Sequence, residues 1–171
     1  MMKNRAKFQQ NGSCGYILKP KYMLDQEIQY NTLTVNSSKK QTRFILQLIS
    51  GDYLPCDKKE VSSRVSITIH GHKLDNAKWN SKTISTGGLN PVWNERTVFD
   101  IFYPELAIIE FNVMSVDDFS GTENNLGYFM ISLPMIRKGY RRIILENIEG
   151  KQLTPAGLFV HCQFEELETV K

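Results

Sequence analysis

Hydrophobic and polar residues alternate along most of this chain, which is the pattern of half-buried β-strands. In the segment SRVSITIHG, for example, Val65, Ile67 and Ile69 fall on one face of a strand. Eight segments of this kind follow one another: Thr42 to Ser50, Ser63 to Gly71, Trp79 to Thr86, Val92 to Ile101, Ala107 to Val116, Leu126 to Leu133, Tyr140 to Leu145 and Gly157 to Glu166. They predict an all-β fold in which eight antiparallel strands form a sandwich of two four-stranded sheets.

Turn residues separate the segments, as in SGDYLPCDKK, GGLNP and DDFSGTENN. In GGLNPVW, the two glycines permit positive φ angles and Pro91 fixes a turn. Trp93 then begins the next strand with a large apolar side chain, so we expect it to anchor the core.

A different region precedes the predicted sandwich. It contains a glycine turn and the short apolar run Tyr16-Ile17-Leu18, which Pro20 ends, followed by a polar, aperiodic stretch from Asp25 to Lys40. One short strand cannot bury itself, so it either pairs with the sandwich or belongs to a larger domain. The second alternative is favoured, and the expected division is a terminal segment at 1–24, a linker at 25–41 and the sandwich domain at 42–168.

Composition limits the classes of function. With 41% hydrophobic and 23% charged residues, the chain reads as a soluble globular protein, and its net charge of +3 is too small to predict nucleic-acid binding. That charge is compatible with an anionic lipid surface. The three cysteines form no CxxC motif, and no apolar run is long enough to span a membrane, so a cytoplasmic location is expected.

Several motifs then resemble one family, in the same order. The stretch FQQNGSCGYILKP, from Phe8 to Pro20, resembles the closing strand of the catalytic barrel (the end of its Y-box) in eukaryotic phosphoinositide-specific phospholipases C. The segments LISGDYLP, SITIHG, GGLNPVWNE, PELAIIEFNV and KGYRRIIL are similar to the C2 domain of that family. GYRRIIL and LTPAGLFV resemble the delta and zeta types. The resemblance extends from Phe8 to Glu166 and implies the C-terminal end of the barrel followed by a complete C2 domain.

This resemblance implies a function for the parent enzyme, the hydrolysis of phosphatidylinositol 4,5-bisphosphate to diacylglycerol and inositol trisphosphate, with calcium in the barrel. The present segment would close the barrel and present a C2 domain to phospholipid. The expected partners are an anionic membrane surface and the rest of the barrel, not nucleic acid, with peripheral membrane association. Two alternatives remain: a catalytically inactive phospholipase-like scaffold, or a stand-alone C2 module for membrane binding or protein interaction.

No catalytic residue is expected in this segment, because the family's histidine pair and the calcium ligands of its barrel lie upstream. His70 and His72 could chelate a metal at i, i+2 on one strand face, but no third ligand is evident. His161 and Cys162 are adjacent in a strand, so their side chains point to opposite faces and cannot form a nucleophile pair.

Many C2 domains hold calcium in three loops, which here would be Gly51 to Ser62, Thr86 to Val92 and Met114 to Leu126. Calcium takes six to eight oxygen ligands, several of them carboxylates. At the positions where the resemblance implies ligands, this chain carries Ser62, Thr86, Ser115 and Asn124 or Asn125. Asp117, Asp118 and Glu123 remain as weak candidates. We therefore expect that the highly charged calcium cage has been lost.

The remaining candidates are basic residues expected to face phospholipid: Lys39, Lys40, Arg43, Lys58, Lys59, Arg64, Arg137, Lys138, Arg141 and Arg142. Each Lys or Arg near an anionic leaflet contributes about 1 kcal/mol. The alternation of a strand sends Arg141 and Arg142 to opposite faces. An ordinary solvated surface is the alternative for each residue.

Overall fold

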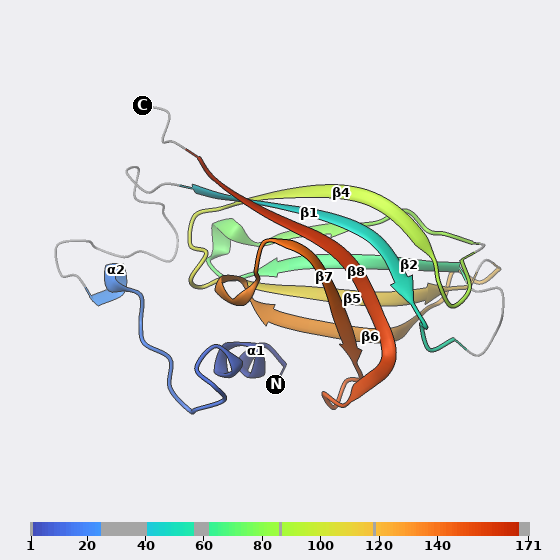
Figure 1. Ribbon diagram of the computed structural model, residues 1–171, viewed down its shortest axis with the longest axis horizontal. Coiled ribbons are helices and arrows are strands. Elements are labelled where there is room, and N and C mark those ends of the chain that lie inside the picture. Colours follow the sequence, from blue (N-terminus) through green and yellow to red (C-terminus); the bar gives the residue numbers. More distant parts are fainter. Residues whose placement is uncertain (1, 25–40, 57–61, 86, 118, 168–171) are drawn as a thin grey trace.

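The computed structural model describes residues 2–24, 41–56, 62–85, 87–117 and 119–167 (Figure 1). Within these ranges the elements are α1 (Met2–Gln9), α2 (Lys21–Leu24), β1 (Gln41–Asp52), β2 (Ser62–His70), the 3-10 turn η1 (Lys73–Asp75), β3 (Ala77–Asn80), β4 (Val92–Ile101), β5 (Ile108–Val116), β6 (Glu123–Ser132), the 3-10 turn η2 (Leu133–Met135), β7 (Gly139–Glu146) and β8 (Gln152–Leu167). The predicted all-β class is confirmed.

The strands lie in the order β3-β2-β5-β6-β7-β8-β1-β4, and all the described neighbours are antiparallel. The first four and the last four strands form the two layers of the sandwich (Figure 1). In the described residues, one pair, Tyr128 with Glu146, joins β6 to β7 and so connects the two layers. The prediction of two four-stranded sheets is thereby confirmed, with this seam as an addition.

The core follows the alternation of the sequence. Val65, Ile67 and Ile69 of β2 have no exposed surface, and Phe111 of the neighbouring β5 is 1% exposed. Trp93 is also buried in this core and donates a long hydrogen bond of 3.4 Å from Nε1 to the carbonyl oxygen of Ser63. Its predicted role as an apolar anchor is confirmed.

The GGLNP turn before Trp93 depends on its glycines in two ways. Gly88 has a φ angle of 49°, in the left-handed region. Gly87 lies so close to Pro91 that an added Cβ would come within 2.4 Å of the proline Cβ, so a larger residue would force the turn apart.

The predicted strand from Trp79 to Thr86 is shorter in the structure. Strand β3 ends at Asn80, and among the described residues 81–85 Ile84 forms an isolated bridge with Ser63. Ser81 explains the early end, because its backbone N–H donates to the Val65 carbonyl while its hydroxyl accepts the Val65 N–H. The side chain of Ser81 thus takes the place of a continued strand ladder.

The region that resembles a barrel strand does not form a strand here. Residues 10–20 lie in no helix or strand, and Tyr16 and Leu18 are 89% and 94% exposed. The physical reason is that a strand needs neighbouring strands for its backbone hydrogen bonds and its apolar face. The boundaries expected at 1–24, 25–41 and 42–168 stay a prediction.

Helix α1 nevertheless packs against the sandwich, along β6 and β5. Both terminal nitrogens of Arg5 bind the carboxylate of Glu146, at 2.9 and 3.0 Å, and one of them also donates to the carbonyl of Gly150. Lys7 Nζ donates to the carbonyl of Glu105 at 2.7 Å and to the hydroxyl of Ser132 at 3.1 Å. Burial of Lys7 lowers its pKa. Two cationic side chains therefore fasten the N-terminal segment to the sandwich.

Candidate lipid-facing site

The three predicted loops meet at one end of the sandwich, which we call the loop pole: the connections β1–β2, β3–β4 and β5–β6. Two contacts join the first two connections, since the Leu54 N–H donates to the Leu89 carbonyl at 2.9 Å and the Tyr53 N–H to the Asn90 side chain at 3.0 Å. The pairing of Val116 with both β2 and β6 brings the third alongside. This arrangement agrees with the expectation that the three loops lie together at one end of the sandwich.

Large apolar side chains project from all three connections of the loop pole. Tyr53 is 60% exposed, Leu89 is 47% exposed and Phe119 is fully exposed. The sequence reasoning missed these residues, although an aromatic residue within a polar turn such as DDFSG is a visible signal. Exposed apolar residues at the tip of a domain are suited to contact with an apolar or interfacial surface.

Two acidic residues of the described part of the loop pole form contacts within the protein. Asp117 Oδ1 accepts hydrogen bonds from the Phe119 N–H at 3.1 Å and from the Ser120 N–H and hydroxyl at 2.8 and 3.0 Å. Glu123 forms an ion pair with Arg64. Ser62 is buried, and the Ser115 hydroxyl donates weakly to the Asn124 carbonyl at 3.4 Å.

The described side chains of the loop pole do not by themselves form a calcium cage. Asp118 and Thr86 lie outside the described residues. In the part of the chain that is described, no three His, Cys, Asp or Glu side chains come together as a metal site would require. Calcium needs several carboxylate oxygens free to bind it, whereas Asp117 holds its own turn and Glu123 neutralises an arginine.

Arg43 and Arg64, two of the predicted basic residues that the structure describes, are paired with acidic side chains. Arg43 lies near the start of β1, at the end opposite the loop pole, where it binds both carboxylate oxygens of Asp100 at 2.7 and 2.9 Å and lowers the pKa of that carboxyl. Arg64 is half-buried and paired with Glu123. Lys39, Lys40, Lys58 and Lys59 lie outside the described residues.

Four of the predicted residues do come together: Arg137, Lys138, Arg141 and Arg142, which we call the basic cluster, all exposed and all at or beside the start of β7. Arg142 lies 3.5 Å from the Asp52 carboxylate. For the other three, no ion pair occurs among the described residues. Arg141 instead donates to the backbone carbonyls of Tyr140 and Lys138, at 2.8 and 2.6 Å. The cluster therefore retains a net positive charge.

The histidines have structural contacts. His70 Nε2 lies 2.5 Å from the Glu110 carboxylate, while Nδ1 of the buried His72 accepts the Leu74 N–H at 3.3 Å. The two rings thus have separate partners.

Cys162 is buried and His161 packs on Tyr140, as expected for opposite faces of a strand. Burial raises the pKa of the Cys162 thiol to about 11, against the opposing effect of Arg141. Cys162 therefore remains a neutral thiol at neutral pH, which is the wrong state for a nucleophile.

Residues 42–146 match the family model described as the C2 domain. The chain belongs to the C2 domain family. The match begins one residue after the start of β1, runs through all three connections of the loop pole and ends at the last residue of β7.

The similarity to known proteins also includes the segment ahead of the C2 domain. The chain is 35% identical over 167 residues to 1-phosphatidylinositol 4,5-bisphosphate phosphodiesterase delta-4 of Pongo abelii, covering 94% of this chain and 22% of that protein. It is 34% identical over 160 residues to the zeta-1 protein of Bos taurus, covering 93% and 25%. The crystal structure of L. pealei PLC21 matches with a TM-score of 0.85 and 27% identity, over 99% of this chain and 22% of that one.

These findings confirm the resemblance to phosphoinositide phospholipases C. The chain spans about a fifth to a quarter of the length of these three relatives. Phospholipases C and C2 domains are generally associated with calcium, and a C2 domain within a phospholipase C suggests contact with phospholipid and with the catalytic domain. Among the residues that the structure describes, no helix has the length and hydropathy needed to cross a membrane.

Proposed function

We propose that this chain is part of a phosphoinositide phospholipase C that hydrolyses phosphatidylinositol 4,5-bisphosphate to diacylglycerol and inositol trisphosphate. It contributes a C2 domain and, ahead of it, the segment that closes the catalytic barrel. Calcium acts in that barrel, outside the present residues. The protein works in the cytoplasm and associates peripherally with the membrane.

The observation that carries this proposal is the extent of the similarity. Isolated C2 domains would match only over the sandwich, whereas 94% of this chain matches the delta-4 protein, including the residues before Gln41. The fastening of α1 by Arg5 and Lys7 supports a rigid connection between the two parts. The exposure of the apolar side chain of Leu18 supports the inference that its segment packs against a part of the barrel outside the present residues.

Within this function, we assign to the C2 domain a contact with anionic phospholipid that does not require calcium in its own loops. The basic cluster supplies positive charge, and Tyr53, Leu89 and Phe119 supply apolar surface at the loop pole. The engagement of Asp117 and Glu123 within the protein supports the absence of a calcium requirement.

The membrane contact is tested by sedimentation with vesicles that contain phosphatidylserine, in millimolar calcium and in chelator, at low and at high salt. We expect binding that hardly changes with calcium and weakens with salt, because exposed charges are screened over about 8 Å at physiological ionic strength. The double variant Arg137→Gln, Lys138→Gln should bind about thirtyfold more weakly, since each of the two charges contributes about 1 kcal/mol.

The matched control is the double variant Lys78→Gln, Arg96→Gln, which removes the same charge from exposed positions on β3 and β4. Equal losses in the two double variants would show that only net charge matters and would contradict the assignment to the basic cluster. Binding that depends strongly on calcium and hardly on salt would show that the loop carboxylates do form a cage.

The enzymatic part is tested by the coding sequence upstream of the present residues in the parent transcript. We expect the pair of catalytic histidines and the calcium-binding carboxylates of a phospholipase C barrel. A barrel without the histidines would contradict catalysis and leave a scaffold with the same C2 domain.

A further inference from the structure

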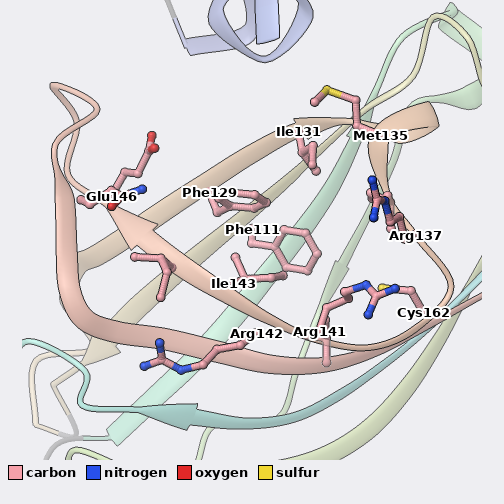
Figure 2. Close-up of a pocket in the computed structure, with 14 residues that line it drawn as sticks. Phe111, Phe129, Ile131, Met135, Arg137, Arg141, Arg142, Ile143, Glu146 and Cys162 are labelled. Atoms are coloured by element: carbon pink, nitrogen blue, oxygen red, sulfur yellow. The ribbon is translucent and has the colours of Figure 1, made fainter. Parts of the chain in front are cut away.

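A cavity of about 370 Å³ opens between β6 and β7, on the side of the seam that faces η2 (Figure 2). Its origin is the pairing of the strands. Strand β5 pairs with β6 from Ile108 to Val116, but β6 and β7 share the single described pair of Tyr128 with Glu146. Away from that pair, β6 and β7 share no further described backbone pairing, and a space opens between the two layers.

The walls of this cavity are apolar and come from both layers. Phe111 of β5 and Phe129 of β6 form one side, with ring centroids 6.2 Å apart, and Ile143 of β7 faces them (Figure 2). Phe129 and Ile131 remain only half-buried although they pack against the core. Interiors are normally packed to high density, so an apolar space of this size between two sheets is a candidate for a ligand.

The charged groups around the cavity differ in their availability. Glu146 lines it, but both carboxylate oxygens bind Arg5. Arg142 lies beside Asp52 and donates to the Pro155 carbonyl. Arg137 and Arg141 have no acidic partner among the described residues, and Figure 2 shows them with Cys162 at the same end of the cavity.

Arg141 has donors to spare. Its guanidinium carries five N–H groups, and its two described bonds go to backbone carbonyls. A guanidinium with free N–H groups binds a carboxylate through paired, charge-assisted hydrogen bonds. The cavity thus combines an apolar interior with two uncompensated arginines at one end.

We propose that this cavity binds a free single-chain anionic amphiphile, a fatty-acid monomer, with its alkyl chain between Phe129 and Ile143 and its carboxylate on Arg137 and Arg141. The volume is at the lower end of the range for ligand pockets, which suits one medium-length chain better than the two chains of a bilayer lipid. The proposal does not rest on the phospholipase assignment or on membrane contact.

The test is titration of the full chain with monomeric decanoate, followed by calorimetry and by amide NMR shifts. We expect saturable binding that shifts amides of β6 and β7. Arg141→Gln should weaken it about tenfold, because a hydrogen bond to a charged group is lost. The uncharged 1-decanol should bind the wild-type chain more weakly than decanoate does. Lys78→Gln, on the distant edge strand β3, should change nothing.

A second variant, Ile131→Trp, fills the cavity from its wall and should abolish decanoate binding while circular dichroism remains that of the wild type. If this variant does not fold, the comparison of Arg141→Gln with 1-decanol decides. Equal decanoate affinity of wild type and Arg141→Gln would overturn the proposal. So would vesicle binding without any binding of monomeric decanoate, a result that would leave the membrane contact of the basic cluster intact.

Discussion

Replacing Asp75 by alanine is expected to lower the free energy of unfolding by about 2–4 kcal/mol. Asp75 ends η1 and is 3% exposed, and its two carboxylate oxygens accept the backbone N–H groups of Phe102 and Tyr103 at 2.8 and 2.9 Å. These contacts join η1, which follows β2, to the turn between β4 and β5. Alanine would leave both N–H groups buried or partly buried without an acceptor, which is the expensive case.

Urea unfolding followed by tryptophan fluorescence measures this loss. Asp100→Ala is the matched control, because Asp100 is an exposed aspartate whose ion pair with Arg43 is screened by solvent, so a much smaller change is expected. Asp75→Asn should also destabilise, since its amide nitrogen would face one of the two N–H donors. Wild-type stability of Asp75→Ala would show that water or a backbone shift replaces the carboxylate.

The second large effect is expected for Phe44→Ala, a loss of about 3–5 kcal/mol. Phe44 of β1 has no exposed surface, and its ring centroid lies 6.4 Å from that of Phe99 and 4.8 Å from that of Phe164. Both neighbours belong to strands that pair with β1, so they are held by their own ladders and cannot collapse fully into the cavity.

Phe119→Ala supplies the matched control, with the same change of residue at a fully exposed position of the loop pole. We expect its stability to remain close to that of the wild type in the same urea titration. Similar losses for the two variants would mean that Phe119 packs in solution, which would also remove it from the proposed lipid contact.

The strands could be predicted because their signal is local. Alternation in SRVSITIHG sets the burial of Val65, Ile67 and Ile69 without knowledge of any neighbour. The end of β3 could not be predicted, because it depends on hydrogen bonds between Ser81 and Val65, sixteen residues apart. Helix α1 was missed for a similar reason: its place is set by contacts such as Arg5 with Glu146.

The candidate site shows the same division. The sequence itself shows serine rather than an acidic residue at positions 62 and 115. The hydrogen bonds of Asp117 and the ion pair of Glu123 within the protein could be seen only in the structure. The basic cluster could be recognised in the sequence because its residues are close in the chain. The ion pair of Arg43 with Asp100 could not be predicted, because it joins two strands that are far apart in the sequence. The cavity between β6 and β7 arises from two layers that diverge, and no local pattern encodes it.

The pairing of Gln41 with Leu167 has a consequence for how the domain can be used. The backbone enters the sandwich at β1 and leaves it at β8, side by side, and β1 reaches the loop pole only at Asp52 (Figure 1). The eleven steps between the twelve residues of β1, at about 3.3 Å each, give about 36 Å along the strand from these attachment points to the loop pole. The two attachment points therefore lie at one end of the domain and the loop pole at the other, so a body joined through both chain ends would leave the loop pole clear.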